Sequence, residues 1–518
     1  MPRALADPVA DTRASSRLPL VPLLALATSV AAALRLPFLG TQSFWFDETY
    51  TLHVVRAGSL AELWDRVGAS ESTPPLFYLL TWAWTHALGS WDEAALRTVS
   101  ALALVASVPV AYCALRRLAG TPAALASAWL VAVSPLLGWY ALDARAYGLM
   151  VLTALLSVWA FAAILERPSR GRLALWALAA AAALWTHWFA GFLVLGEALA
   201  LLWLRREARR GTLLAGGAAL LALAPLAGLL REQTGDERAA FIAQTSVADR
   251  VEQLVRQFGA GVNVPRTWLE ATLLAVALGG LAAGTWLTIR RASAPVRDAP
   301  ADDRGTSPSR DAGGARELPG RDGDRALLAL VAVGLLVPLA VAASGVYDRF
   351  NVRNLLYLWP LLAALAAPAL LRLRAAPLAA LLALGIATSL WTQLDWRYGN
   401  ADWRGAVERI APHIARDDQV IAVTPLGAPV AAHYLDRVAS TSPVATRRAW
   451  LVVEPARSDG HRDLRPSDAP VLAQLVAAFP HHREQRVHGF RLIELTAPTP
   501  IPLDPAGMRG ATLFPPAG

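Results

Sequence analysis

The sequence predicts an all-α polytopic membrane protein of about 11 transmembrane helices, with interfacial helices in the first outer loop and a small α/β extracytoplasmic C-terminal domain. Of its 518 residues, 55% are hydrophobic and only 17% are charged, and the mean hydropathy is +0.39. Soluble proteins carry about 25% charged residues. The charges cluster between long uncharged stretches, which is the layout of membrane spans joined by polar connectors. After residue 396 the apolar periodicity changes, which indicates a separate domain.

The predicted membrane spans are recognised by their length and their apolar composition. About eleven segments approach the roughly 17 to 25 apolar residues that a transmembrane helix needs. The fifth and sixth are separated only by the polar break Thr186-His187-Trp188. If these two segments were a single span, the predicted orientation of every later span would be inverted. The predicted spans lie near 18–38, 94–115, 122–140, 146–165, 172–187, 189–204, 211–230, 268–289, 326–345, 354–371 and 375–392.

The distribution of arginine predicts the orientation. Arginines precede the first span and then recur in alternate connectors, which the positive-inside rule assigns to the cytoplasm. The N-terminus is therefore expected inside, and an odd number of spans puts the C-terminus outside. The first span resembles a cleavable signal peptide, but its length and the later spans favour its retention. The arginines concerned are Arg3, Arg13, Arg17, Arg116, Arg117, Arg167, Arg170, Arg172, Arg205, Arg206, Arg209, Arg210, Arg290, Arg291, Arg372 and Arg374.

The remaining segments are not spans. Residues 1–17 form a cytoplasmic tail, and 18–395 form the transmembrane domain. Within it, 39–93 is an outer loop whose stretches 60–67 and 76–88 read as helices lying along the interface. Residues 292–324 have almost no large apolar side chain, so we expect a disordered cytoplasmic loop. Residues 396–497 form the α/β domain, with strands at 419–424, 450–453 and 490–495 and helices at 401–415 and 471–479, and 498–518 form a Pro-rich tail.

Composition limits the partners and the compartment. A net charge of +8 suits nucleic acid or anionic lipid, but the arginines sit in short loops beside apolar runs, so lipid is favoured. Lysine is absent, and the single Cys113 lies in an apolar run, which favours a small core residue and leaves no internal disulfide. Heavy use of Ala, Arg, Leu and Gly is typical of GC-rich bacterial genomes. We therefore expect a bacterial inner-membrane protein.

An adjacent acid pair, Asp47-Glu48, follows the first span within an aromatic cluster. Desolvation there would raise the pKa of a carboxyl group towards the range of a general base. The alternative is an acid pair at a helix start that complements the helix dipole. A further acid, Glu71, precedes Pro74-Pro75, which can start a helix and are equally compatible with an ordinary helix entry.

Other polar residues gather at the same predicted side of the membrane. Singly, each is compatible with an interfacial anchor or a salt bridge. Together they line one face with both carboxylates and arginines, whereas the cytoplasmic connectors hold mainly arginine. These residues are Arg97, Asp143, Arg145, Tyr147, His187, Tyr347, Asp348, Arg349, Arg353 and Asn354.

The order of these motifs resembles the GT-C superfamily of membrane glycosyltransferases. It is more closely similar to the bacterial branch related to protein O-mannosyltransferases and the aminoarabinose transferases of lipid A. The resemblance covers about residues 40–230, and Asp402-Trp403-Arg404 also resembles a recurrent start of the outer domain. The motifs are Phe44-Trp45-Phe46-Asp47-Glu48, Glu71 with Pro74-Pro75-Leu76-Phe77-Tyr78, Ala95-Leu96-Arg97-Thr98-Val99-Ser100, and Asp143-Ala144-Arg145-Ala146-Tyr147.

The resemblance implies a polyprenyl-phosphate sugar donor, a glycan, lipid or protein acceptor, and transfer with inversion on the extracytoplasmic face. The matched acid Asp47 would be the catalytic base, which suits the poor nucleophilicity of a sugar hydroxyl. Arg145 is the first choice for binding the phosphate, with Arg97 and Arg353 behind it. Glu48 or Glu71 would position the acceptor or hold Asp47. The remaining candidates for substrate binding are Asp143, Tyr147 and His187.

Several alternatives stay open. Relatives near the aminoarabinose transferases place lysine beside the acid that precedes the double proline, whereas Ser72-Thr73 stand here, so their mode of phosphate binding does not carry over directly. Glu71 and His187 could bind a metal ion, but two ligands do not make a site, and we assign no metal and no cofactor. The favoured sugar, mannose, rests on analogy alone. The rival functions are a lipid-linked sugar transporter or flippase, for which midplane charges and internal repeats would be typical, and a scaffold whose outer domain binds a partner.

Overall fold

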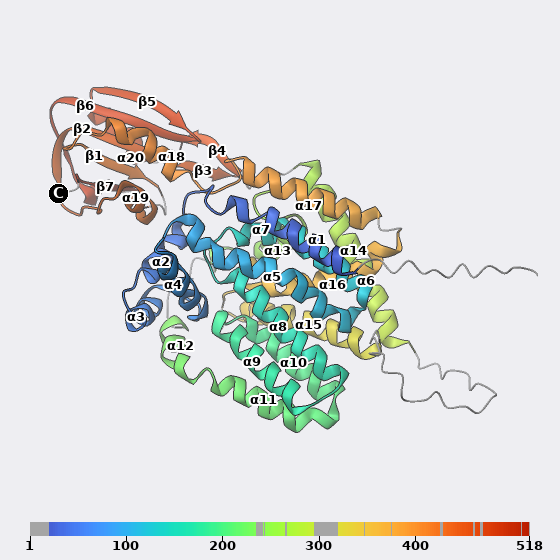
Figure 1. The fold of residues 1–518 in the computed structure, drawn as a ribbon. Coiled ribbons are helices and arrows are strands. Elements are labelled where there is room, and N and C mark those ends of the chain that lie inside the picture. Colours follow the sequence, from blue (N-terminus) through green and yellow to red (C-terminus); the bar gives the residue numbers. More distant parts are fainter. Residues whose placement is uncertain are drawn as a thin grey trace, which may run out of the picture.

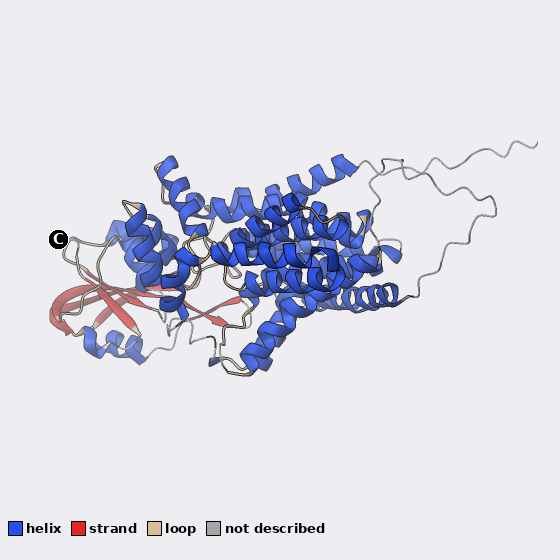
Figure 2. Ribbon diagram, turned by 90° about the horizontal axis from the view of Figure 1, so that it is seen from below, coloured by secondary structure: helices blue, strands red, loops and turns tan. Residues whose placement is uncertain are grey.

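The structure is a computed structural model in which a large helical bundle carries a sheet domain at one end (Figure 1; Figure 2). It describes residues 20–234, 242, 244–264, 267–294, 320–345, 348–373, 376–424, 428–458, 461–466, 470–508 and 510–516. The predicted tail 1–17 and most of the predicted loop 292–324 lie outside these residues.

The bundle confirms a multi-pass membrane protein. Within the described ranges, eight helical segments are long and apolar enough to cross a membrane, and a bent pair makes a ninth. Each of the eleven predicted spans coincides with a helix or helix pair, although the fifth and sixth correspond to helices of only 17 and 15 residues. The helices are α1 (Leu20–Ala33), α5 (Glu93–Ala119), α6 (Thr121–Val133), α7 (Pro135–Ala141), α8 (Tyr147–Glu166), α9 (Arg170–Thr186), α10 (Ala190–Leu204), α11 (Arg209–Leu221), α12 (Ala227–Thr234), α14 (Trp268–Ser293), α15 (Arg321–Ala343), α16 (Trp359–Arg372) and α17 (Ala376–Leu394), with a 3-10 segment η5 (Val352–Leu358) before α16.

The third span is bent where α6 meets α7. The two helices meet at 53° across Ser134-Pro135. Proline disfavours the helical conformation of the preceding residue and lacks an N–H for the helix ladder, so the chain turns at this point. The Ser134 hydroxyl accepts a hydrogen bond from the Leu137 backbone N–H and caps α7. The bend directs α7 and the connector after it toward the end of the bundle that carries the sheet domain.

Close packing of α5 against α8 fixes the start of α8. A side chain on Gly148 would place its Cβ only 2.6 Å from the Ser100 carbonyl oxygen, so only glycine allows this approach. The Ser100 hydroxyl also donates a hydrogen bond to the Arg145 carbonyl oxygen at 2.9 Å. The connector between α7 and α8 is therefore held against α5.

The outer loop contains the two helices expected along the interface. They are α3 (Leu60–Ser70) and α4 (Leu76–Leu88), and a further helix, α2 (Phe46–Val55), precedes them. An additional helix that was not predicted, α13 (Val247–Ala260), lies between the seventh and eighth spans. Its apolar and charged residues alternate with helical spacing, so it is too polar to be recognised as a span.

The ends of the predicted loop 292–324 are helical, which corrects that boundary. Helix α14 continues to Ser293 and α15 begins at Arg321. Acidic residues in the first turn of α15 complement the helix dipole and pair with arginines of neighbouring segments. Asp322 lies 2.8 Å from Arg205, and Asp324 lies 2.9 Å from Arg291.

The C-terminal part forms the predicted α/β domain. Its five-stranded sheet has the order β5-β6-β2-β1-β7, in which β1 and β2 are parallel and the other neighbours are antiparallel. Helix α20 covers one face, and α18 and α19 cover the other, so every residue of β1, which lies between β2 and β7, is buried. The elements are α18 (Trp403–Ile410), β1 (Gln419–Val423), α19 (Ala428–Leu435), β2 (Val444–Val453), a separate hairpin of β3 (Pro455–Ser458) and β4 (His461–Pro466), α20 (Pro470–Ala478), β5 (His481–Val487), β6 (Phe490–Leu503) and β7 (Ala511–Phe514).

The prediction of a Pro-rich tail after residue 497 is wrong. Strand β6 continues to Leu503, and β7 pairs with β1 at the far edge of the sheet. The pairing of β6 with β2 shifts register between Thr446 and Arg448, opposite the segment that contains Pro498 and Pro500. A bulge accommodates residues that cannot donate to the ladder, and pairing resumes beyond it. The prolines therefore interrupt the strand without ending it.

Candidate active site

All nine predicted site residues lie at the end of the bundle that faces the sheet domain. They come from α2, the α3–α4 connector, α5, the α7–α8 connector, the start of α8, the α9–α10 connector and η5. The contacts described below link most of them into carboxylate–guanidinium pairs and stacked rings. Segments separated by up to 306 residues thus meet in one cluster.

Asp47 lies in the first turn of α2 and forms an ion pair with Arg353. Its Oδ2 atom is 2.9 Å from Arg353 Nη1, and the two side chains are 21% and 19% exposed. The carboxylate also complements the dipole at the start of α2, so its geometry is compatible with both the helix-start interpretation and the predicted role as a base. This pair is the most exposed of the three ion pairs in the cluster.

Glu71 and Arg145 form a bidentate pair. Arg145 Nη1 lies 2.9 Å from Glu71 Oε1, and Nη2 lies 2.7 Å from Oε2. Arg145 Nη1 also donates to the Asp47 carbonyl oxygen and to the Thr51 hydroxyl, each at 3.2 Å. These contacts connect the α3–α4 connector to α2 through Arg145. Only 11% of the Arg145 side chain is exposed, so it is largely withdrawn from solvent. Tyr78, after the double proline, places its ring 6.0 Å from this guanidinium.

Glu48 and Arg97 form a fully buried pair. Arg97 Nε and Nη2 lie 2.7 and 2.6 Å from the two carboxylate oxygens, and neither side chain is exposed. Glu48 also accepts from the Trp45 and Ala144 backbone N–H groups. The remaining Arg97 donors go to carbonyl oxygens of residues 39, 42 and 43. The hydrogen-bonding groups of both side chains are already occupied by protein partners. This geometry therefore favours a role in positioning neighbouring segments over the predicted direct roles of Glu48 in catalysis and Arg97 in substrate binding.

Asp143 is the carboxylate without a guanidinium partner. Its Oδ1 accepts from Trp45 Nε1 at 3.1 Å, whereas its buried Oδ2 has no hydrogen-bond partner in the described part of the chain. Burial, with the nearby Glu48 carboxylate second, raises the pKa of Asp143 to about 8. Asp143 is therefore mainly protonated at neutral pH.

The rings of Tyr147 and His187 pack against each other within the cluster. Their ring centroids are 5.9 Å apart, and the Arg353 guanidinium lies 5.9 Å from the Tyr147 centroid. Burial, followed by the charges of Arg353 and Arg145, lowers the pKa of His187 to about 3. The imidazole is thus neutral at physiological pH, and the three ion pairs leave the cluster close to electroneutral.

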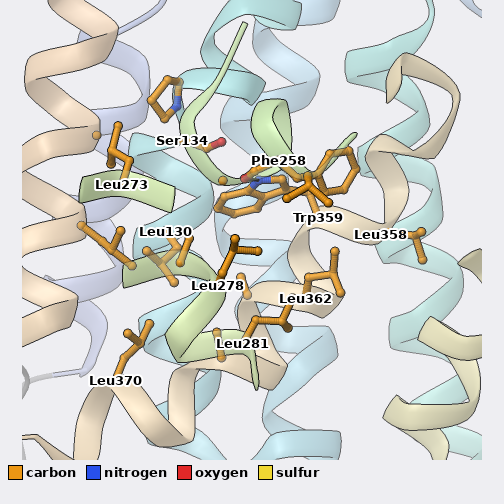
Figure 3. Close-up of a pocket in the computed structure, with 18 of the residues that line it drawn as sticks. Leu130, Ser134, Phe258, Leu273, Leu278, Leu281, Leu358, Trp359, Leu362 and Leu370 are labelled. Carbon is orange, nitrogen blue, oxygen red and sulfur yellow. Dashed lines mark hydrogen bonds between the residues drawn. The ribbon is translucent and has the colours of Figure 1, made fainter. Parts of the chain in front are cut away.

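An apolar cavity of about 220 Å³ lies in the bundle beside η5 (Figure 3). Residues of α6, α7, α13, α14, α15, α16 and α17 line it, and Leu358 connects its wall to η5, which carries Arg353. Phe258 of α13 and Trp359 form part of the lining, and Trp359 Nε1 donates to the Phe258 carbonyl oxygen at 3.1 Å. This cavity was not predicted, because α13, which supplies part of its lining, was not predicted. The available signal was the helical spacing of the apolar residues of α13, which are Val247, Val251, Leu254, Val255 and Phe258.

Comparison with known proteins supports the predicted resemblance. Residues 72–229 match the family described as dolichyl-phosphate-mannose-protein mannosyltransferase, which confirms the resemblance over that part of the chain. No curated protein sequence matches the chain. Among solved structures, oligosaccharyltransferase AglB from Archaeoglobus fulgidus, in complex with an inhibitory peptide and a dolichol-phosphate, is 13% identical with a TM-score of 0.47, covering 80% of this chain and 63% of that one. ArnT from Cupriavidus metallidurans, bound to undecaprenyl phosphate, is 12% identical with a TM-score of 0.42, covering 92% and 97%.

Proposed function

We propose that this chain is an integral-membrane glycosyltransferase that moves a sugar from a polyprenyl-phosphate donor to an acceptor hydroxyl on the extracytoplasmic face. The partly exposed Asp47–Arg353 pair carries this proposal, because it puts a proton acceptor beside a ligand for phosphate. The family match over residues 72–229, which include Arg97, Arg145 and His187, supports the same class of reaction. Mannose is the favoured sugar by analogy with that family, and the bacterial inner membrane is the proposed location.

In the proposed reaction, the acceptor hydroxyl oxygen attacks the anomeric carbon of the donor sugar. Asp47 removes the hydroxyl proton as the new glycosidic bond forms, which suits a carboxylate acting as a general base. The bond between the anomeric carbon and the phosphate oxygen breaks, and the polyprenyl phosphate leaves with the electron pair. Attack opposite the leaving group inverts the anomeric configuration.

Arg353 is the guanidinium best placed to meet the donor phosphate. The exposed fraction of its side chain is 19%, compared with 11% for Arg145 and 0% for Arg97. A phosphate offers oxygens that match the planar guanidinium, so an arriving donor competes with Asp47 for Arg353. Transfer of Arg353 from Asp47 to the phosphate leaves the carboxylate free to accept a proton. Donor binding would thereby prepare the base.

The apolar cavity is the proposed place for the isoprenoid chain. It lies beside the segment that carries Arg353, and its lining consists mainly of leucine with Phe258 and Trp359 (Figure 3). Burying apolar chain stabilises binding by about 0.8 kcal/mol per methylene group. With its phosphate near Arg353 and its isoprenoid chain in this cavity, the donor would occupy one continuous site.

A reconstituted assay tests the proposal. Purified protein is mixed with undecaprenyl-phosphate mannose and with acceptors extracted from a deletion strain, and products are identified by mass spectrometry. A mannosylated product with release of undecaprenyl phosphate supports the transferase, whereas lipid movement without any glycosidic product supports the transporter. Assaying with and without EDTA tests whether the reaction requires a metal ion.

A further inference from the structure

The sheet domain holds the six residues that lead into α2, here called the pre-α2 segment (residues 40–45). Ser43 is buried, and its hydroxyl donates to Asp402 Oδ1 and accepts from the Arg404 backbone N–H, each at 3.1 Å. These two partners flank Trp403 at the start of α18. One hydroxyl of the outer loop is therefore enclosed by a single turn of the C-terminal domain.

The same turn and its neighbours hold the rest of the segment. The Arg404 guanidinium donates to the Gly40 carbonyl oxygen at 3.0 Å and to Glu93 Oε1 at 3.1 Å. Tyr434 of α19 donates to Glu93 Oε1 at 2.6 Å and accepts from the Phe44 backbone N–H at 2.7 Å. Figure 1 shows α19 beside the start of α2. The domain thus fixes backbone groups at both ends of the pre-α2 segment.

The turn is itself rigidly built. Asp402 caps α18 by accepting from the Gly405 backbone N–H at 3.0 Å, and its Oδ2 atom lies 2.6 Å from His488 Nδ1. Trp403 is buried and packs edge-on against Phe490 of the sheet, with the ring centroids 5.1 Å apart. The groups that hold Ser43 are anchored to the sheet and do not depend on a flexible linker.

The pre-α2 segment connects directly to the candidate base. Its carbonyl oxygens at Gln42 and Ser43 accept from Arg97, at 2.8 and 3.0 Å, and Arg97 is paired with Glu48. Trp45 is the N-cap residue of α2, and its backbone N–H donates to Glu48 at 3.2 Å. Since Asp47 follows Trp45 by two residues, the position of this segment determines where α2 starts and where the Asp47 carboxylate lies.

We propose that the Asp402-Trp403-Arg404 turn of the C-terminal domain is a positioning element for the transfer reaction, acting through Ser43 and the Arg97–Glu48 pair on Asp47. This inference rests on the proposed function. The C-terminal domain then has a part in the reaction without contacting a substrate, because it sets the geometry of the base. Asp402 and Arg404 are positioning residues in this scheme.

Kinetics of the full-length protein test the inference. A misplacement of about 1 Å from a remote substitution can cost about 100-fold in rate. We expect Asp402→Ala and Ser43→Ala to lower kcat by about 10- to 100-fold while KM for the donor changes by less than about twofold. Asp402→Asn, which keeps an oxygen for Ser43 and Gly405, should retain more activity. Glu484→Gln, which breaks an ion pair with Arg491 elsewhere in the same domain, is the matched control and should leave kcat unchanged.

A combined variant separates positioning from general damage. Adding Asp402→Ala to Asp47→Asn should cause little further loss, because the turn acts through the carboxylate that is already removed. An equal loss in both backgrounds would overturn the inference. If Asp402→Ala does not fold, Ser43→Ala is used in the same comparison, since it leaves the sheet domain and its helix cap intact.

Amide hydrogen exchange gives a readout that does not depend on transfer. In Asp402→Ala and Ser43→Ala, the amides of residues 40–49 should exchange faster than in the wild type, with no change in Glu484→Gln. Unchanged exchange in this stretch would overturn the inference. Faster exchange in the variants of a protein that makes no glycosidic product would instead refute the proposed function and leave the holding of the pre-α2 segment established.

Discussion

The Asp47 carboxylate and the Arg353 guanidinium lie 2.9 Å apart, although 306 residues separate them in the chain. Asp47 lies in the first turn of α2, and Arg353 lies in η5 between α15 and α16. Their contact joins α2 to η5, and Leu358 of η5 lines the apolar cavity. This contact is also the ion pair of the cluster that is most exposed, so an incoming anion can reach it.

Replacement of Arg353 should weaken donor binding. A hydrogen bond to a charged group contributes about 1.5 to 3 kcal/mol, so Arg353→Gln should raise the apparent KM for the lipid-linked sugar by about 10- to 100-fold. Arg353→Lys keeps the charge but loses the planar fork, and an intermediate effect is expected. Steady-state kinetics with the purified variants measure this. If Arg145→Lys raises KM and Arg353→Gln does not, the phosphate is bound by the more buried arginine.

Loss of one partner of the buried Glu48–Arg97 pair should destabilise the protein. Glu48→Gln leaves a fully buried guanidinium without its counter-ion, and such a loss typically costs about 3 to 5 kcal/mol. Thermal unfolding of the detergent-solubilised protein should show a clearly lower midpoint. Replacing both partners, as in Glu48→Leu with Arg97→Met, should recover part of that loss. A Glu48→Gln protein of normal stability and no activity would instead assign Glu48 a direct role in catalysis.

Asp143 should make stability depend on pH. Its pKa is raised by burial from 3.8 to about 8, so the folded state binds more protons than the unfolded state between these values. Stability from this group is complete at low pH and is lost as pH rises through 8. The lowered pKa of His187, about 3, acts in the opposite direction below pH 6.5, so the variant and the wild type are compared between pH 6.5 and 8, where their difference in stability reports Asp143. Asp143→Asn should gain thermal stability relative to the wild type across that window. A difference that is constant with pH would exclude this ionisation.

Cysteine labelling tests the proposed orientation. In a Cys113→Ala background, Val438→Cys in the sheet domain should react with an impermeant maleimide in intact cells, because Val438 is 84% exposed. Gly171→Cys at the start of α9 should react only after permeabilisation. The structure leaves open space for a side chain at Gly171, so this substitution is tolerated. The reverse pattern of labelling would place the cluster on the cytoplasmic side.

Much of the fold follows from sequence because membrane spans are read from length and apolarity alone. The strands at 419–424 and 450–453 were predictable because buried parallel strands are continuous apolar runs. Helix α13 was not, because its charged residues hide its apolar face from a search for spans. Strand β7 was missed because the prolines before it indicated a tail.

The candidate residues were found by their types and order, but their pairing could not be predicted. Which arginine meets which carboxylate depends on contacts between segments far apart in the chain. The sequence favoured Arg145 for the phosphate, whereas burial makes Arg353 the more accessible guanidinium. The holding of Ser43 by Asp402 and Arg404 likewise arises only when the sheet domain is packed against the outer loop.

The transfer rate of purified Asp47→Asn tests the central claim most directly. Asparagine preserves size and hydrogen bonding but cannot accept the proton, and general bases contribute about 10²- to 10⁴-fold to rate. The matched control is Asp395→Asn, which breaks an Asp–Arg pair with Arg397 outside the cluster and should leave the rate unchanged. We predict that Asp47→Asn inserts, purifies and binds donor while transferring sugar at least about 100-fold more slowly than the wild type. Transfer at a near wild-type rate would contradict the account.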